Sequence, residues 1–188
     1  MANTGPQETP DTHDLGKLTK WLNALASVSN DHFPVCALFL ASGNDQRAHN
    51  IFRVYRTAFE EYGAGFHNLV IFGQHGVSRT CSEIIRGLGL SYVQIPSLVL
   101  ITNDMKINGM VFHTTPLPRG VLSGRALEED GKDVPWRIAL DAIGYSYHTN
   151  AASSLDDVFG LKRLECSNHS LFNALEAIKK RVEETPNG

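Results

Sequence analysis

Residues 93–100 read VQIPSLVL, so that Pro96 stands directly before a continuous apolar run. A proline just before a strand removes no hydrogen bond from the interior of the sheet, so Pro96 is compatible with a strand that follows it. The apolar run over 98–102 is too short for a helix. Residues 102–104 (TND) give a turn signal, and in residues 106–113 apolar and polar positions roughly alternate. The two segments are therefore predicted to form an antiparallel hairpin.

Two buried strands and their helices precede this hairpin. Residues 36–41 (CALFLA) and 68–73 (NLVIFG) are short apolar runs, typical of strands that are buried on both faces. Between them, residues 45–62 carry apolar side chains at helical spacing, and a helical crossover makes the strands it joins parallel. A further helix is predicted over 78–88.

The two ends of the chain give simpler signals. Residues 1–12 are polar and predict a disordered tail before one domain over 13–185, a length at which a core needs neither disulfides nor metals. Leucines at helical spacing predict a leading helix over 14–27 and a last helix over about 170–184.

Helix starts are expected at side chains that can accept hydrogen bonds from the first free N–H groups. Thr12 or Asp14 fits this role in the leading helix, and Thr80 with Glu83 forms a capping box for the helix over 78–88. Ser42 or Asn44 would cap the helix that follows the first strand.

The segment 114–168 is harder to interpret. Its prolines and glycines break regular structure, and the acidic residues 128–131 read as a solvated loop. Short helices are predicted over 135–143 and 155–159. We therefore divide the domain into a core over about 33–113, an insertion over about 114–168 and the C-terminal helix.

The order of elements, together with Ile95 and Pro96 before the third core strand, resembles the thioredoxin-like superfamily, in which an apolar residue and a cis proline hold these positions. The resemblance covers about 33–113, with the last helix as its completion. It implies a three-layer α/β/α fold with a central mixed sheet, extended here by an N-terminal helix and the insertion.

The resemblance also implies that residues 39–47 hold the active loop. Redox members of the family carry CxxC there, whereas the matching positions here are Asn44 and Arg47. Neither residue supplies the thiolate or the second sulfur that thiol–disulfide exchange needs. The loop is therefore expected to form part of a binding groove, whose residues are Gly43, Asn44, Asp45, Arg47, Ile95, Pro96 and Ser97.

Other reactive or aromatic residues give weaker signals. Cys81, near Arg79 at a helix start, is a candidate reactive thiol, although a half-buried thiol that packs under the sheet is the simpler interpretation. His75 follows a strand end but has no nucleophile or acidic partner at recognisable spacing. The aromatic stretch of Tyr145, Tyr147 and His148, with Trp136 upstream, indicates either an interface or packing of an added helix.

Composition limits the classes of partner. The net charge of -3, from 17 basic and 20 acidic residues, and the lack of a basic cluster argue against nucleic acid binding. No apolar run reaches the length of a membrane helix and no signal peptide is visible, which predicts a soluble cytoplasmic protein. The three cysteines and eight histidines show no metal-ligand spacing, so neither a metal nor a cofactor is expected.

The sequence thus predicts a non-catalytic thioredoxin-fold binding or assembly module for a protein or peptide partner, and leaves a homodimer open. One alternative is a divergent thiol peroxidase or redox sensor that uses Cys81, which requires that thiol to be exposed and ionised at neutral pH. The second alternative is a flavodoxin-like protein that binds a small phosphorylated ligand after Gly43. It requires a parallel third strand.

Overall fold

The computed structural model describes residues 9–28, 33–104, 106–120, 133–151, 155–167 and 170–185. The predictions for residues 1–8 and for the acidic loop at 128–131 lie outside these ranges.

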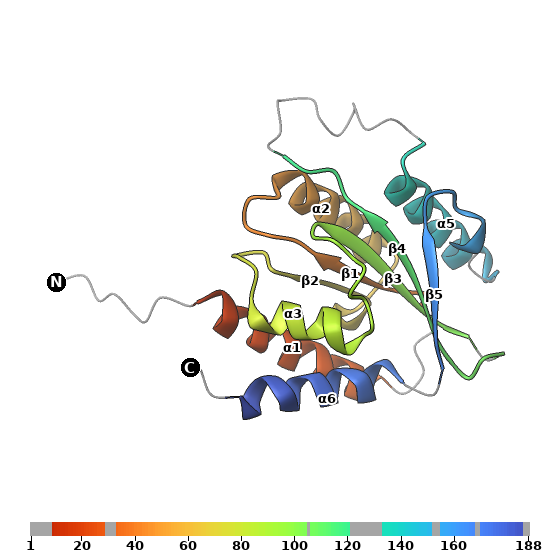
Figure 1. Ribbon diagram of the computed structural model, residues 1–188. Coiled ribbons are helices and arrows are strands. Elements are labelled where there is room, and N and C mark those ends of the chain that lie inside the picture. The colour runs from red at the N-terminus through yellow and green to blue at the C-terminus, as the bar shows by residue number, and fades with distance from the viewer. Residues whose placement is uncertain are drawn as a thin grey trace.

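A five-stranded mixed sheet in the order β2-β1-β3-β4-β5 forms the centre of the molecule (Figure 1). Its strands are β1 (Cys36–Leu40), β2 (Leu69–Phe72), β3 (Ser97–Asp104), β4 (Gly109–Pro116) and β5 (Lys162–Ser167). The mixed α/β class expected from the sequence is therefore confirmed.

The strand directions follow the predicted pattern. β1 and β2 are parallel, as a helical crossover requires, whereas β1 and β3 are antiparallel and β3 and β4 form the antiparallel hairpin. Its second strand begins later than predicted, at Gly109, after a turn in which Asn108 has a positive φ of 48°. Because the third strand is antiparallel, the flavodoxin-like alternative is wrong.

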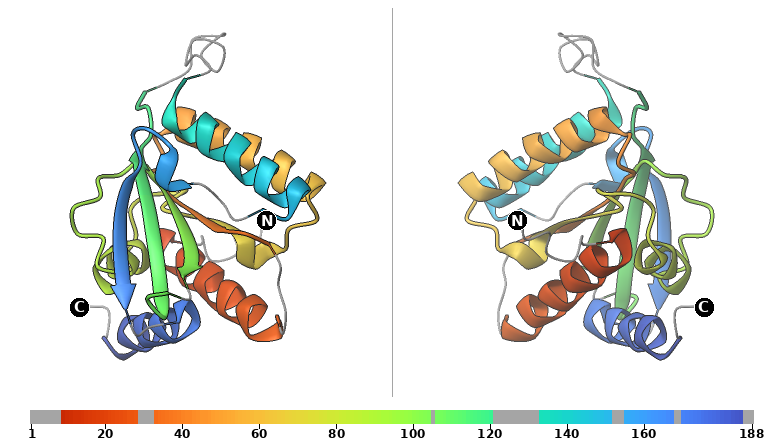
Figure 2. Two further views of the ribbon diagram at one scale, coloured as in Figure 1. Left: turned by 90° about the vertical axis from the view of Figure 1, so that its right-hand side faces the viewer. Right: turned by 90° about the vertical axis from the view of Figure 1, so that its left-hand side faces the viewer.

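Helices cover both faces of the sheet (Figure 2). One face is covered by α2 (Gln46–Glu61) and α5 (Pro135–Thr149), and the other by α1 (Pro10–Ser27), α3 (Arg79–Gly87) and α6 (Leu171–Glu184). Two short 3-10 helices, η1 (Phe66–Asn68) and η2 (Leu155–Asp157), lie in the connections. The helix predicted over 155–159 is thus only the turn η2.

Alternate residues of β1 point into two separate cores, because successive side chains of a strand point to opposite faces. Ala37 and Phe39 belong to the cluster under α2 and α5, which is rich in aromatic rings. Leu38 and Leu40 belong to the cluster under α1, α3 and α6, which is mainly aliphatic. All five residues of β1 are buried, which explains the unbroken apolar run CALFL.

The helix caps differ from the predicted ones. Thr9 caps α1, with Pro10 at its first position, so that residues 10–12 are helical and not part of a tail. Ser78 caps α3 by accepting a hydrogen bond from Cys81 N, in place of the capping box predicted at residues 80 and 83. In both helices the free N–H groups donate to the side-chain oxygen of a residue that lies earlier in the sequence than the predicted cap.

The segment predicted as an insertion supplies two regular elements. α5 extends six residues beyond the predicted helix end at Ile143, to Thr149, and is followed by the C-cap Asn150, whose φ of 52° is left-handed. β5 was not predicted as a strand, and it pairs with β4 from Gly109–Ser167 to Thr114–Lys162. This segment therefore completes the sheet and one helical layer.

Candidate functional site

The loop that follows β1 has a shape fixed by its own side chains. Asp45 is the N-cap of α2, but its carboxylate accepts hydrogen bonds from Ser42, at 2.9 Å from the backbone N and 2.8 Å from Oγ. The ring of His49 reaches back to Ser42 O, at 2.9 Å. Neither Ser42 nor Asn44 is the cap, and the closed turn leaves Gly43 and Asn44 exposed at its tip.

The sheet register brings this loop to the same end of the sheet as Pro96. Leu40, the last residue of β1, pairs with Ser97, the first residue of β3. Pro96 and Ser97 are buried and Ile95 is half-buried, and the Ile95–Pro96 peptide bond is cis. The register therefore places the two halves of the predicted groove at the same end of the sheet, while the backbone that Gly43 faces directly is that of residues 74–76.

Not every predicted groove residue is equally accessible. Asn44 is exposed, whereas Arg47, in the first turn of α2, is only half-exposed. The backbone acceptors beside Pro96 are already used, because Arg119 Nη2 donates to Ile95 O at 2.9 Å and Leu117 N donates to Pro96 O at 2.9 Å. Arg119, which sequence reasoning did not select, thus closes one side of this edge with an exposed side chain.

Cys81 lacks both properties that a reactive thiol needs. Its side chain is fully buried among the aliphatic residues under α3. Burial raises the pKa of the Cys81 thiol to about 12, and the nearby charge of Asp14 raises it further. The structure therefore contradicts the exposed thiolate that the redox alternative requires, and Cys81 packs under the sheet, more deeply buried than the simpler interpretation expected. Cys36 is also buried, and Cys166 is partly exposed.

The loop that carries His75 is fixed by the N-terminal helix. Asp14, almost fully buried, accepts hydrogen bonds from Gly73 N at 2.9 Å and from Ser78 Oγ at 2.5 Å. The exposed ring of His75 meets His13 edge-on, with ring centroids 4.3 Å apart. No nucleophilic side chain is recorded in contact with His75 in the described part of the chain, so its surroundings indicate loop packing.

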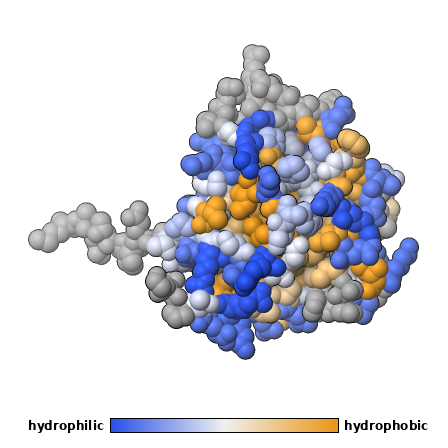
Figure 3. Space-filling model, viewed as in Figure 1, coloured by the Kyte–Doolittle hydropathy of each residue, from blue (hydrophilic) through white to orange (hydrophobic). Residues whose placement is uncertain are grey.

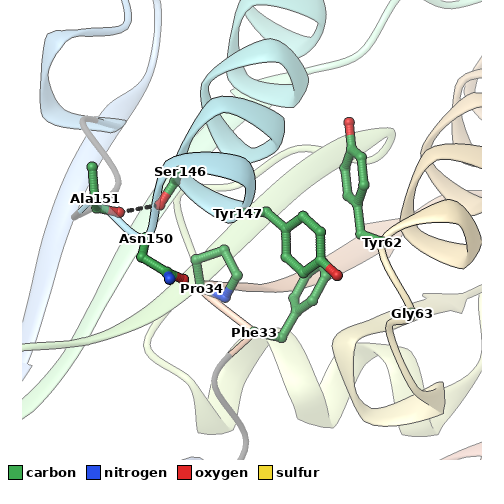
Figure 4. Close-up of a pocket in the computed structure, with 8 residues that line it drawn as sticks. All are labelled: Phe33, Pro34, Tyr62, Gly63, Ser146, Tyr147, Asn150 and Ala151. Carbon is green, nitrogen blue, oxygen red and sulfur yellow. Dashed lines mark hydrogen bonds between the residues drawn. The ribbon is translucent and has the colours of Figure 1, made fainter.

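The most voluminous of the described cavities lies at the opposite end of β1. It measures about 620 Å³ and lies where the C-terminal ends of α2 and α5 approach the entry to β1 (Figure 4). It is lined by Phe33, Pro34, Tyr62, Gly63, Ser146, Tyr147, Asn150 and Ala151. We call this space the aromatic cavity.

Three rings form one side of the aromatic cavity. Tyr62 and Tyr147 are stacked, with centroids 5.1 Å apart and planes inclined by 25°, and Phe33 lies 6.0 Å from Tyr147. The other side, seen in Figure 4, is polar: Ser146 Oγ donates to Ala151 O at 2.5 Å, next to Asn150. The cavity therefore combines flat π faces with backbone and amide oxygens.

The packing interpretation of the predicted aromatic stretch is confirmed for Trp136, whereas the interface interpretation stays a prediction. Trp136 is buried in the core, so it serves packing. Tyr145 is 66% exposed and Tyr147 is 40% exposed, although only Tyr147 lines the cavity. Sequence reasoning missed Phe33 and Tyr62 because they are distant in sequence. The aromatic cluster at 145–148 was the only signal of the site.

A second, adjoining cavity of about 380 Å³ contains a buried histidine. His113 Nε2 lies 2.7 Å from Asp156 Oδ1, and the Arg163 guanidinium lies 2.9 Å from the same oxygen. The hydrogen bond with His113, followed by charge interactions, lowers the pKa of Asp156. These contacts tie η2 to the sheet.

Within the described ranges, no cluster of three or more His, Cys, Asp or Glu side chains is arranged to hold a metal ion. None of the described helices combines the length and apolar character needed to cross a bilayer. On the face shown in Figure 3, apolar residues form separate patches among hydrophilic ones.

No family model, curated protein or solved structure matches the chain.

Proposed function

We propose that this chain is a thioredoxin-like domain without thiol–disulfide chemistry that binds a protein or peptide partner at the edge formed by residues 43–47 and 95–97. The fold part of the proposal is supported by the parallel pair β1 and β2 and the antiparallel hairpin that Pro96 opens. These are the features on which the sequence resemblance rests.

The observation that carries the binding proposal is the pairing of Leu40 with Ser97. It sets an exposed loop tip, at Gly43 and Asn44, at the same end of the sheet as the start of β3, and none of the three cysteines lies in either segment. An exposed amide beside a strand start offers donors and acceptors to an extended chain. Binding is therefore the activity that these residues support.

Other exposed side chains extend this edge. Lys162 pairs with Thr114 and Pro116 pairs with Ser97, so that the loop before β5 lies toward the same end of the sheet as Pro96. This loop carries Phe159, which is 90% exposed. An exposed aromatic ring is a common anchor in protein interfaces. The partner is thus expected to contact Phe159 as well as the Asn44 loop.

Arg119 makes the proposal specific. Its guanidinium donates a hydrogen bond to the backbone carbonyl oxygen of Ile95. A peptide that binds as an added strand would need this same oxygen as an acceptor. A peptide must either bind by side chains alone or displace this exposed arginine. Arg119→Ala frees the carbonyl and should strengthen binding of peptides that pair through their backbone, by up to about ten-fold if one hydrogen bond is gained.

The test uses random-peptide display on the full chain, followed by affinity measurement of the selected peptides. Asn44→Ala and Phe159→Ala should each weaken binding at least about ten-fold, since interface anchors cost more than about 1.4 kcal/mol when truncated. The matched control is Asn23→Ala, an exposed asparagine on α1, which should leave the affinity unchanged. Peptides that bind all three variants equally would contradict the assigned edge.

A second measurement addresses the enzyme alternative. The full chain is assayed for reduction of a disulfide substrate with a dithiol and for consumption of peroxide. We expect no turnover above that of a Cys81→Ala variant, because the Cys81 thiol is buried and protonated at neutral pH. Turnover that disappears in this variant would overturn the non-redox proposal.

A further inference from the structure

The aromatic cavity lies at the end of the sheet opposite the proposed partner edge, and its chemistry is different. Phe33 and Pro34 precede β1, whereas the partner edge follows it. The cavity must therefore be considered separately from the proposed binding module.

The walls of the cavity favour positive charge. The faces of aromatic rings are negative, and three rings, those of Phe33, Tyr62 and Tyr147, line the cavity, with one face of Tyr62 stacked on Tyr147. Among the described residues that line the cavity, none is a lysine, an arginine or a carboxylate. The ring faces are thus the main electrostatic feature of the lining.

The positions of the two long helices add to this preference. α2 ends at Glu61 and α5 ends at Thr149, and the residues that directly follow these ends line the cavity. A helix C-terminus carries partial negative charge from carbonyl groups that lack intrahelical partners. Two such ends, of helices with 16 and 15 residues, therefore face one cavity.

Two carboxylates, those of Glu61 and Asp141, do not line the aromatic cavity but lie close enough to change the electrostatic potential at Tyr62. Burial raises the pKa of the Tyr62 hydroxyl, and the charges of Glu61 and Asp141 raise it further. The imidazole of His148 packs edge-on against Tyr62, with centroids 5.4 Å apart. The surroundings of the rings thus hold two acidic side chains that attract a cation from outside the cavity.

We propose that the aromatic cavity binds an organic ammonium group, held by cation–π contact with Tyr62, Tyr147 and Phe33 and favoured by the partial negative charge at the C-terminal ends of α2 and α5. A methylated ammonium suits the site better than a metal ion, because its apolar surface packs against rings while its charge is spread over the methyl groups. Such a group occurs on free small molecules and on modified lysine side chains.

The experiment is an NMR titration of the isotope-labelled full chain at pH 8. The probes are choline, its neutral carbon isostere 3,3-dimethylbutanol, and N-acetyl-trimethyllysine methylamide. Choline should shift the resonances of residues 62–63 and 146–151 with a dissociation constant on the order of 1 mM, and should bind at least about ten-fold more tightly than the isostere. Tighter binding of the lysine derivative than of choline would assign the site to a modified protein, and the reverse order to a free ligand.

Two tyrosines of α5 provide a matched pair of variants. Tyr147→Leu removes a lining ring and should weaken choline binding about ten-fold, whereas Tyr145→Leu alters a tyrosine that does not line the cavity and should leave binding unchanged. Tyr147→Phe keeps the ring face and should retain affinity within about two-fold. This last variant and the isostere comparison decide the question even where Tyr147→Leu does not fold.

Three results would overturn the proposal. The first is equal affinity for choline and its neutral isostere, which would show an apolar pocket without charge preference. The second is unchanged affinity in Tyr147→Leu. The third is a set of shifts confined to residues outside the cavity.

Discussion

The two helical layers of this molecule are held by different kinds of interaction. The layer of α2 and α5 packs many aromatic rings, and a fully buried hydrogen bond joins Tyr55 Oη of α2 to Trp136 O of α5, at 2.6 Å. The layer of α1, α3 and α6 packs mainly aliphatic side chains, with Trp21 against Phe72 as its ring contact, and the Asp14 carboxylate ties it to the loop after β2. The ring packing leaves the aromatic cavity open at the C-terminal ends of α2 and α5. The buried carboxylate of Asp14, the polar anchor of the other layer, instead holds the loop between β2 and α3 closed.

The largest expected effect concerns the polar anchor. Asp14→Ala leaves Gly73 N–H and Ser78 Oγ–H without their acceptor in a buried place, and should lower the free energy of unfolding by about 3 kcal/mol. Urea denaturation measures this loss. The control Asp11→Ala removes an exposed acceptor of Arg79 N and should cost no more than about 1 kcal/mol. Equal losses would mean that burial of Asp14 contributes nothing.

The second effect is a loss of stability in alkali. Because the folded-state pKa of Cys81 is raised from 9.0 to about 12, the unfolded chain loses a proton above pH 9 that the folded chain keeps. Stability is therefore complete below pH 9 and falls as the pH rises toward 12, by about 2 kcal/mol at pH 10.5. Urea titrations from pH 8 to 10.5 measure the slope.

The cysteine variants separate this effect from other alkaline titrations. Cys81→Ala should remove most of the slope, whatever it costs in packing at neutral pH. Cys166→Ala, which alters a partly exposed thiol, should keep the slope. An identical slope in both variants would assign the alkaline loss to other groups, such as the buried hydroxyl of Tyr55, whose pKa is also raised by burial.

Two helical glycines compare the tightness of the layers directly. A Cβ at Gly87 would lie 2.4 Å from Ile178 Cγ1, a fully buried side chain, whereas a Cβ at Gly144 would meet the far end of Tyr62, 2.5 Å from its hydroxyl oxygen. Gly87→Ala should destabilise by about 1–2 kcal/mol through overpacking. Gly144→Ala should be near neutral, because Tyr62 can turn toward the cavity and alanine favours the helix.

Thermal unfolding of the two alanine variants, with wild type alongside, measures this difference. The reverse order of stability would show that the aromatic layer is the tighter one. Gly144→Ala should also reduce choline binding, because it displaces Tyr62 from its stack with Tyr147.

The smallest effect concerns the hydrogen bond within the aromatic layer. Tyr55→Phe keeps the ring but leaves the Trp136 carbonyl without this donor, and should lower the free energy of unfolding by about 1 kcal/mol. Chemical denaturation is the measurement, and Tyr145→Phe, at an exposed position, is the control that should change nothing. If Tyr55→Phe lowered the free energy of unfolding as much as Asp14→Ala does, the two helical layers would depend equally on their buried hydrogen bonds, and the proposed difference between them would be wrong.

The central elements were predictable because their patterns depend on burial. The apolar runs of β1 and β2 and the helical spacing in α2 follow from full or one-sided burial, and the antiparallel hairpin followed from its turn. β5 was missed because it is an edge strand, in which Lys162, Arg163 and Glu165 give no apolar pattern. Its pairing with β4 depends on tertiary context alone.

The candidate sites were predictable to different degrees. The residues of the partner edge follow from one local segment and one resemblance, but the occupation of the Ile95 carbonyl by Arg119 requires the folded chain. The aromatic cavity combines Phe33, Tyr62 and Tyr147 from three distant segments, which no local spacing relates. Caps were misplaced by one to five residues, since several neighbouring side chains could accept the same hydrogen bonds.

The charged strand β5 has a consequence for self-association. A sheet edge presents unpaired backbone groups on which a strand of another molecule can add. Here Lys162 lies over the ring of Tyr92 at 3.9 Å, and Arg163 forms ion pairs with Asp156, Glu165 and Asp104. Adding a strand at this edge would bury those charges, while the opposite edge strand, β2, has only four residues. Both edges of the sheet therefore resist the strand addition that leads to aggregation in concentrated solution.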